Sequence, residues 1–120
     1  MPRRILAAVS DLFFVAKLQS AARQAGVELA LATTVDDLQA KARLGADLVV
    51  IDLNDRSFDA LSAIATLRQE PETAALPLLG FLSHVETELA QKAKAAGCDR
   101  VLPRSQFSAR LTDLLSGGLT

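Results

Sequence analysis

Polar residues that follow the apolar runs of this sequence are the groups that could do chemistry. They are Asp11 after the first run, Asp52 at the end of the third, Ser83 after the fourth and Arg104 after the fifth. If the runs are strands of one open parallel sheet, their carboxyl ends meet at the edge where ligands bind in such sheets. Two carboxylates, a hydroxyl and a guanidinium would then converge there. Asp52 follows the apolar stretch LVVI, and an acid in that place is either functional or paired.

The runs themselves predict an α/β fold. They cover residues 4–9, 27–32, 46–52, 77–82 and 100–102. Residues 46–52 are apolar on both alternating faces, which is typical of a strand covered on both sides in a parallel sheet. Apolar residues recur at helical spacing after each run, and the last such pattern, from Phe107 to Leu115, predicts one helix. Strand and helix alternate five times, which predicts an open sheet with helices on both faces.

Side chains that can cap helices mark where several of the helices begin. Thr34 and Ser83 each precede an acidic residue by three positions, the spacing of a capping box. Asp59 is expected to cap the third helix. Asp11 has two interpretations of equal weight, as the N-cap of the first helix or as a ligand-binding carboxylate.

Composition excludes several classes of protein. The chain has 120 residues with a net charge of −1, and so carries no electrostatic footprint for nucleic acid or an anionic membrane. Cys98 is the single cysteine beside one histidine, which excludes an intramolecular disulfide and a Cys/His zinc site. No stretch is long and apolar enough to span a membrane, and Asp11 interrupts the one stretch that imitates a secretory signal. We expect a cytoplasmic protein with one domain over residues 1–120, a core at about 3–115 and a tail at 116–120.

The sequence resembles the receiver domains of response regulators over residues 3–115. The best segment is residues 46–61, ADLVVIDLNDRSFDAL, where Asp52, Leu53, Asp59 and Leu61 keep the family's spacing. Further matches are the Leu-Pro pair that opens the fourth strand, Ala-Ala-Gly ending at position 97, and a basic residue seven places later. Pattern and resemblance together predict a three-layer α/β/α fold whose five-stranded parallel sheet has the flavodoxin-like order 2-1-3-4-5.

The resemblance implies a phosphorylation site. Asp52 matches the aspartate that takes a phosphoryl group from a histidine kinase. Asp11, Asp52 and the backbone carbonyl of Asn54 match the family's Mg²⁺ ligands, and oxygen ligands are what Mg²⁺ prefers. Arg104, and Ser83 if the alignment is shifted by one residue, match the positions that bind the phosphoryl oxygens.

The sequence departs from the family at most of these positions. Ser10 replaces one carboxylate of the acidic pocket, and Arg104 replaces the lysine. The Thr/Ser position aligns without a gap with Leu82, and only a shift by one residue gives Ser83, for which capping is the favoured role. A lost carboxylate weakens a Mg²⁺ site, whereas Arg104 is expected to pair with Asp52 in place of the metal's charge.

We therefore expect a receiver-like signalling domain with an eroded phosphorylation site that acts mainly through protein–protein interaction. Its partners would be a histidine kinase or an output protein, with a homodimer through the fourth helix, fifth strand and fifth helix as a further expectation. The alternative is a working Mg²⁺-dependent phosphoacceptor. A small α/β enzyme is disfavoured, because the first strand is followed by no Gly-rich loop. The signalling interpretation expects the Asp52 carboxylate to be presented at the open rim of the sheet, and a buried carboxylate or an antiparallel sheet would overturn it.

Overall fold

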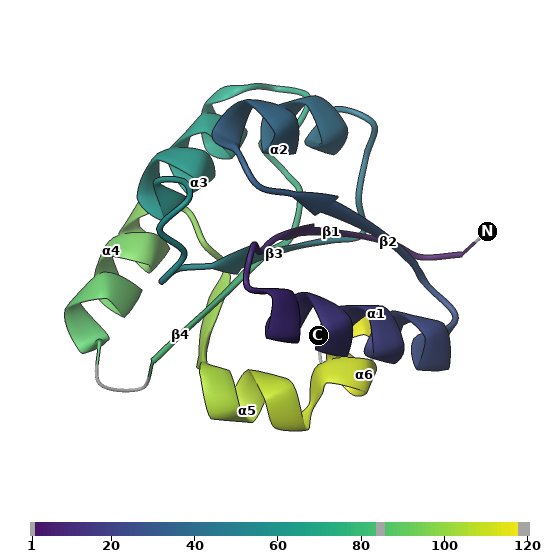
Figure 1. The fold of residues 1–120 in the computed structure, drawn as a ribbon. Coiled ribbons are helices and arrows are strands. Elements are labelled where there is room, and N and C mark those ends of the chain that lie inside the picture. Colours follow the sequence, from purple (N-terminus) through teal and green to yellow (C-terminus); the bar gives the residue numbers. More distant parts are fainter. Residues whose placement is uncertain (1, 84–85, 118–120) are drawn as a thin grey trace.

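The computed structural model describes residues 2–83 and 86–117, in which strands and helices alternate along the chain (Figure 1). The strands are β1 (Arg4–Ala8), β2 (Glu28–Ala32), β3 (Leu48–Asp52), β4 (Leu78–Leu82) and β5 (Arg100–Pro103). The helices are α1 (Leu12–Ala25), α2 (Val35–Ala42), α3 (Ala60–Gln69), α4 (Thr87–Ala96), α5 (Arg104–Ala109) and α6 (Leu111–Ser116).

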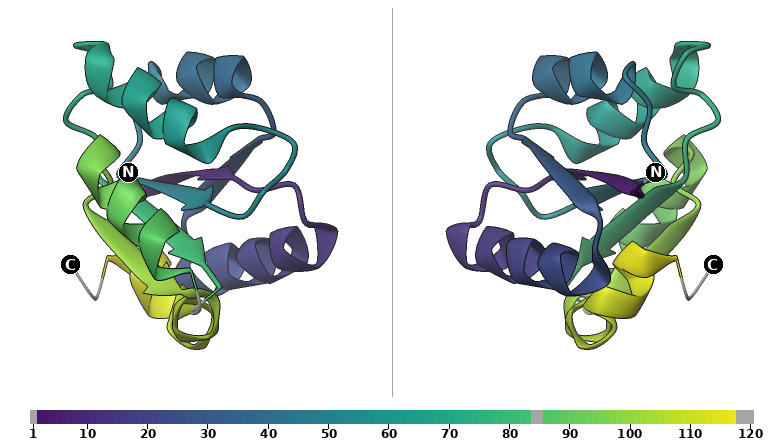
Figure 2. Two further views of the ribbon diagram at one scale, coloured as in Figure 1. Left: turned by 90° about the vertical axis from the view of Figure 1, so that its left-hand side faces the viewer. Right: turned by 90° about the vertical axis from the view of Figure 1, so that its right-hand side faces the viewer.

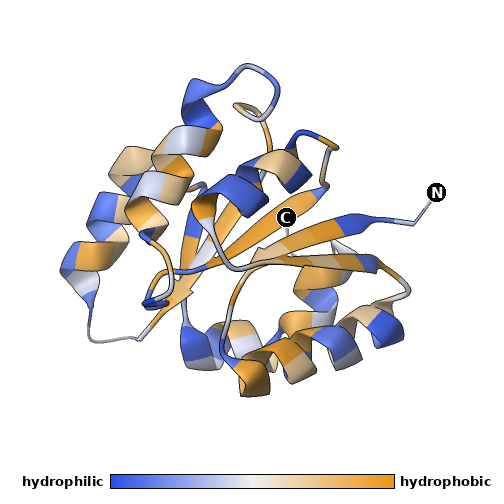
Figure 3. Ribbon diagram, turned by 45° about the horizontal axis from the view of Figure 1, so that its top comes forward, coloured by the Kyte–Doolittle hydropathy of each residue, from blue (hydrophilic) through white to orange (hydrophobic). Residues whose placement is uncertain are grey.

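All five strands form one parallel sheet in the order β2-β1-β3-β4-β5, as predicted. Helices α1, α5 and α6 cover one face, and α2, α3 and α4 cover the other (Figures 1 and 2). The side chains of β3 explain the arrangement. Val49 and Ile51 pack into the core on one side of the sheet, while Val50 packs into the core on the other. Both faces of this strand are therefore apolar. The strands in the centre of Figure 3 are coloured mostly orange, which marks hydrophobic residues.

Three of the expected helix caps are confirmed, and one is wrong. The side chains of Asp11, Thr34 and Asp59 each accept a hydrogen bond from a backbone N–H of the first turn of α1, α2 and α3. Ser83 does not cap the fourth helix. That helix begins at Thr87 with Glu86 at the N-cap, so the capping-box spacing at Ser83 is coincidental.

The last helical pattern is divided, contrary to the prediction of one helix. Arg110 has φ −113° and ψ 17°, which ends α5 before α6 begins at Leu111. Phe107 of α5 and Leu114 of α6 nevertheless reach the same core. Of the predicted tail, Ser116 belongs to α6, and residues 118–120 lie outside the described residues. Among the helices described, none has the length and apolar character needed to cross a bilayer.

Candidate functional site

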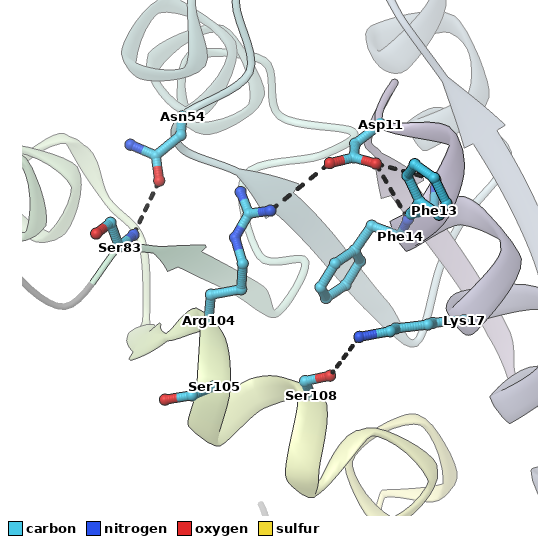
Figure 4. Close-up of a pocket in the computed structure, with 9 residues that line it drawn as sticks. All are labelled: Asp11, Phe13, Phe14, Lys17, Asn54, Ser83, Arg104, Ser105 and Ser108. Carbon is cyan, nitrogen blue, oxygen red and sulfur yellow. Dashed lines mark hydrogen bonds and ion pairs between the residues drawn. The ribbon is translucent and has the colours of Figure 1, made fainter.

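The carboxyl ends of the strands bring most of the predicted residues to one edge of the sheet. A cavity of about 580 Å³ opens there between α1, α5 and the loops that follow β3 and β4 (Figure 4). Its lining includes four predicted site residues, Asp11, Asn54, Ser83 and Arg104. Asp52 lies beside this cavity at the end of β3 and is in contact with Arg104.

The Asp52 carboxylate is buried, with only 3% of the residue exposed. Its Oδ1 accepts a hydrogen bond from the backbone N–H of Asn54 at 2.9 Å and one from Arg104 at 3.4 Å. Burial raises the pKa of Asp52 above its ordinary value, although the Asn54 N–H and the Arg104 charge act in the opposite direction. The expectation that this carboxylate is presented openly at the rim is therefore wrong, and the signalling interpretation loses the support it was expected to draw from an open Asp52. It lies at the rim of the sheet but beneath other side chains, because the arginine after β5 folds over it.

Arg104 does pair with Asp52, as predicted, but its guanidinium does not grip one carboxylate with both nitrogens. One terminal nitrogen lies 3.4 Å from Asp52 Oδ1, and the other lies 3.7 Å from Asp11 Oδ2. The guanidinium carbon also lies 5.6 Å and 5.4 Å from the ring centroids of Phe14 and Phe81. Cation–π attraction and two carboxylates therefore hold the same group. Arg104 occupies the place between the acids where a metal ion would need to lie.

A cluster of three phenylalanine rings supports this arginine, and the sequence analysis did not find it. The ring centroid of Phe81 of β4 lies 4.6 Å from that of Phe14 of α1 and 4.7 Å from that of Phe107 of α5, with interplanar angles of 17° and 9°. The centroids of Phe14 and Phe107 are 5.7 Å apart, so each ring contacts the other two. Phe81 is paired with Asp52 across the β3–β4 ladder. The signal available in the sequence was that Phe14 and Phe107 fall on apolar helix faces and Phe81 falls near the end of the fourth apolar run.

Asp11 has the first of the two roles that the sequence left open, the N-cap of α1, while its role as a ligand-binding carboxylate stays a prediction. Its Oδ1 accepts hydrogen bonds from the backbone N–H groups of Phe13 and Phe14, at 2.9 Å and 3.3 Å, and so caps α1. Its Oδ2 faces Arg104. Both oxygens of the Asp11 carboxylate therefore have partners within the chain.

Ser10 is hydrogen-bonded to an acidic residue, Asp55, that the sequence analysis missed. Its hydroxyl and its backbone N–H donate to the carboxylate of Asp55 at 2.7–2.8 Å, and Ser57 donates to the same carboxylate. Burial opposes ionisation of Asp55, but these hydrogen bonds outweigh it and lower the pKa of Asp55. Asp-x-Ser at positions 55–57 is a local turn signal that could have suggested this residue. The hydroxyl that replaces a family carboxylate thus joins two loops of the site.

Ser83 lines the cavity, whereas Leu82 is buried in the core on the α3–α4 side. The backbone N–H of Ser83 donates to Asn54 Oδ1 at 2.9 Å, and Asn54 Nδ2 donates to Glu86 at 2.9 Å. The Asn54 side chain therefore joins the loop after β3 to the loop after β4. Of the two candidates for the Thr/Ser position, Ser83 is the one whose place in the structure faces the site.

The residues present do not fit a Mg²⁺ ion in the arrangement described. Across residues 2–83 and 86–117, no group of three or more His, Cys, Asp or Glu side chains is placed to hold a metal. The two carboxylates that could contribute, Asp11 and Asp52, are both engaged by Arg104. Mg²⁺ requires near-octahedral oxygen ligands, and a guanidinium between the carboxylates excludes that geometry.

No protein-family model matches the chain, and no curated protein sequence matches it. Solved structures do. The chemotaxis protein CheY4 of Vibrio cholerae is 20% identical, with a TM-score of 0.84, over 99% of this chain and 100% of that one. The receiver domain of sensor histidine kinase PA1611 of Pseudomonas aeruginosa, which has magnesium in its active-site cleft, is 16% identical with a TM-score of 0.83, over 98% and 97%. A putative response regulator of Chloroflexus aurantiacus is 19% identical with a TM-score of 0.82, over 98% and 99%. The chain therefore has the CheY-like fold of response-regulator receiver domains.

Proposed function

We propose that residues 1–120 form a single receiver-like domain of a two-component signalling pathway. The domain acts mainly by binding other proteins, and its phosphorylation site is closed, which means that Arg104 covers the Asp52 carboxylate. The receiver fold of the solved structures supports the signalling role. A cytoplasmic location and the absence of catalytic activity belong to the same proposal. Its partners are a histidine kinase or an output protein, and a homodimer through α4, β5 and α5 stays a prediction.

The observation that carries this proposal is the contact of Arg104 with Asp52 and Asp11. Phosphoryl transfer requires a carboxylate oxygen to approach the phosphorus in line with the leaving group. Asp52 is buried, and its Oδ1 is occupied by Arg104 and the Asn54 N–H. Burial and the contact with Arg104 therefore both disfavour reaction.

A working phosphoacceptor is the second candidate, and one feature favours it. Asp11 and Asp52 face the same cation, so movement of Arg104 would leave two carboxylates turned toward one space. Ser83 lines the adjoining cavity and would be available to a phosphoryl oxygen.

Incubation with Mg²⁺ and acetyl phosphate, followed by intact mass spectrometry, separates the two candidates. We expect the natural chain to gain no phosphoryl group, because Arg104 covers Asp52. A double variant, Ser10→Asp with Arg104→Lys, restores the family's acid pair and lysine and is expected to gain one. Adding Asp52→Asn to this variant is the matched control and should remove the gain. Labelling of the natural chain, lost in Asp52→Asn, would reject the closed site in favour of the working phosphoacceptor.

A further inference from the structure

A separate cavity lies at the other edge of the sheet from Asp52, where the amino ends of β1, β3, β4 and β5 meet α6. Its volume is about 400 Å³, which is within the range of small-molecule sites. Aliphatic side chains form much of its wall, among them Leu48, Leu79 and Leu114. Leu79 and Leu114 belong to the core on the α1 side of the sheet, and Leu48 packs against that core. The cavity therefore offers a wall that an aliphatic chain could contact.

The division of the last helical pattern at Arg110 explains why this end of the sheet is open. A helix that follows a strand of a parallel sheet runs back over the sheet toward the amino ends of the strands. Here α5 contacts β4 and β5, whereas α6 packs against α1 and α5 (Figure 1). One straight helix would continue over the amino ends of β4 and β5. The turn toward α1 leaves that part of the sheet as the wall of a cavity.

Arg3 gives this cavity a guanidinium with unused donors. Its Nε donates to the Leu115 carbonyl at 3.0 Å, which holds the side chain against the end of α6. The backbone of Gly117 packs closely on the same group, since a Cβ at that position would lie 3.1 Å from the guanidinium carbon. Within residues 2–83 and 86–117, the two terminal nitrogens of Arg3 have neither a hydrogen bond nor an ion pair. Two such nitrogens match the two oxygens of a carboxylate.

Two acidic residues in the lining restrict the charge of the ligand. Asp47 and Asp99 are exposed, and each carboxylate accepts a hydrogen bond at 2.8 Å from the backbone N–H that begins β1 or β4. Asp99 also forms an ion pair with Arg68 at 2.9 Å. Both acids thus hold the starts of strands, which leaves Arg3 as the group available to a ligand. Their negative charge would repel a phosphate dianion more strongly than a ligand with a single negative charge.

We propose that this cavity binds a small monocarboxylic acid with an aliphatic chain. The carboxylate would lie on the terminal nitrogens of Arg3, and the chain would lie against Leu48, Leu79 and Leu114. Apolar burial and charge-assisted hydrogen bonds then act on the two ends of one molecule. The inference goes beyond the proposed function, because it concerns the opposite edge of the sheet and requires neither the contact of Arg104 with Asp52 nor a partner protein.

The test uses octanoate as the probe, with octylammonium, which has the opposite charge, and acetate, which lacks the chain, as matched ligands. An amide NMR titration should show saturable shifts at the starts of β3, β4 and β5 and along α6, with a Kd of about 1 mM or tighter for octanoate alone. Arg3→Gln should weaken binding at least about tenfold, because it removes the charge-assisted hydrogen bonds. Arg56→Gln, at an exposed arginine in the loop after β3, is the matched control and should leave binding unchanged.

A second variant keeps the test decisive if Arg3→Gln fails to fold. Leu48→Phe adds volume at the cavity wall while Arg3 stays in place, and it should also weaken octanoate binding, whereas Leu44→Phe, at an exposed leucine after α2, should not. Absence of saturable shifts, equal binding of octylammonium, or shifts confined to the Asp52 edge would overturn the proposal. Full affinity in the folded Arg3→Gln or Leu48→Phe protein would do the same. Phosphorylation of the natural chain on Asp52 would reject the closed site without changing these outcomes.

Discussion

Replacement of Arg104 by glutamine removes the charge that faces Asp52 and shortens the side chain that covers it. The separation of the two groups is 3.4 Å, at which Coulomb's law gives about 5 kcal/mol for an effective dielectric constant of about 20 and about 1 kcal/mol in bulk water. Because 37% of the Arg104 side chain is exposed, solvent screening keeps the value near the lower figure. We expect Arg104→Gln to lower the free energy of unfolding by about 1–2 kcal/mol at about pH 8.

The loss should depend on pH in a defined direction. Burial raises the pKa of Asp52 and Arg104 lowers it, so the variant's Asp52 has a still higher pKa. Below the pKa of an unfolded aspartate, about 3.9, Asp52 is protonated in both folded proteins, so the charge attraction between Arg104 and Asp52 is absent. The destabilisation by Arg104→Gln is therefore small at about pH 4 and grows as the pH rises through the folded pKa of Asp52.

Urea unfolding followed by circular dichroism is the suitable assay, because the chain has no tryptophan or tyrosine for intrinsic fluorescence. Arg56→Gln, an exposed arginine in the loop after β3, is the matched control and should stay within about 0.5 kcal/mol of the natural chain. A double-mutant cycle with Asp52→Asn isolates the pairwise term. Equal losses at both pH values, or no coupling in the cycle, would show that Arg104 acts by packing on the phenylalanine rings instead of by its charge.

Two further substitutions test hydrogen bonds, one set between two loops of the site and one network that joins α2 to the segment after α3. Asp55→Asn should destabilise the chain by about 1–2 kcal/mol near neutral pH, since it weakens the hydrogen bonds from Ser10. Because the folded pKa of Asp55 is lowered, this stabilisation is present above the unfolded pKa and lost as the pH falls through the folded value; a loss that grows in acid would contradict it. Thr73→Val should cost about 1–3 kcal/mol in urea unfolding, because the buried Thr73 hydroxyl donates to the Leu67 carbonyl at 2.6 Å and accepts from Gln39. An unchanged unfolding midpoint would exclude a role for that network.

Local patterns in the sequence were sufficient for the five strands and their alternation with helices, although they predicted one helix where α5 and α6 are separate. Each predicted strand lies within one or two residues of the observed one, because apolar alternation and the residues that end a run act over a few positions. The caps at Thr34 and Asp59 were predictable for the same reason, since the side chain bonds its own helix. Ser83 carries the same local signal, but its backbone N–H is bonded by Asn54, 29 residues away, and the helix begins later.

The sequence predicted which residues form the site, whereas the tertiary structure decided how exposed these residues are and what they contact. Which strand ends carry Asp11, Asp52 and Arg104 follows from strand positions and the resemblance to receiver domains. Whether the Asp52 carboxylate is open or covered depends on a contact with Arg104, 52 residues away, and on the stacked rings beneath that guanidinium. Exposure depends on what other segments place over a side chain, so no pattern local to Asp52 encodes it; burial and the pKa that follows from it arise only when the segments pack together.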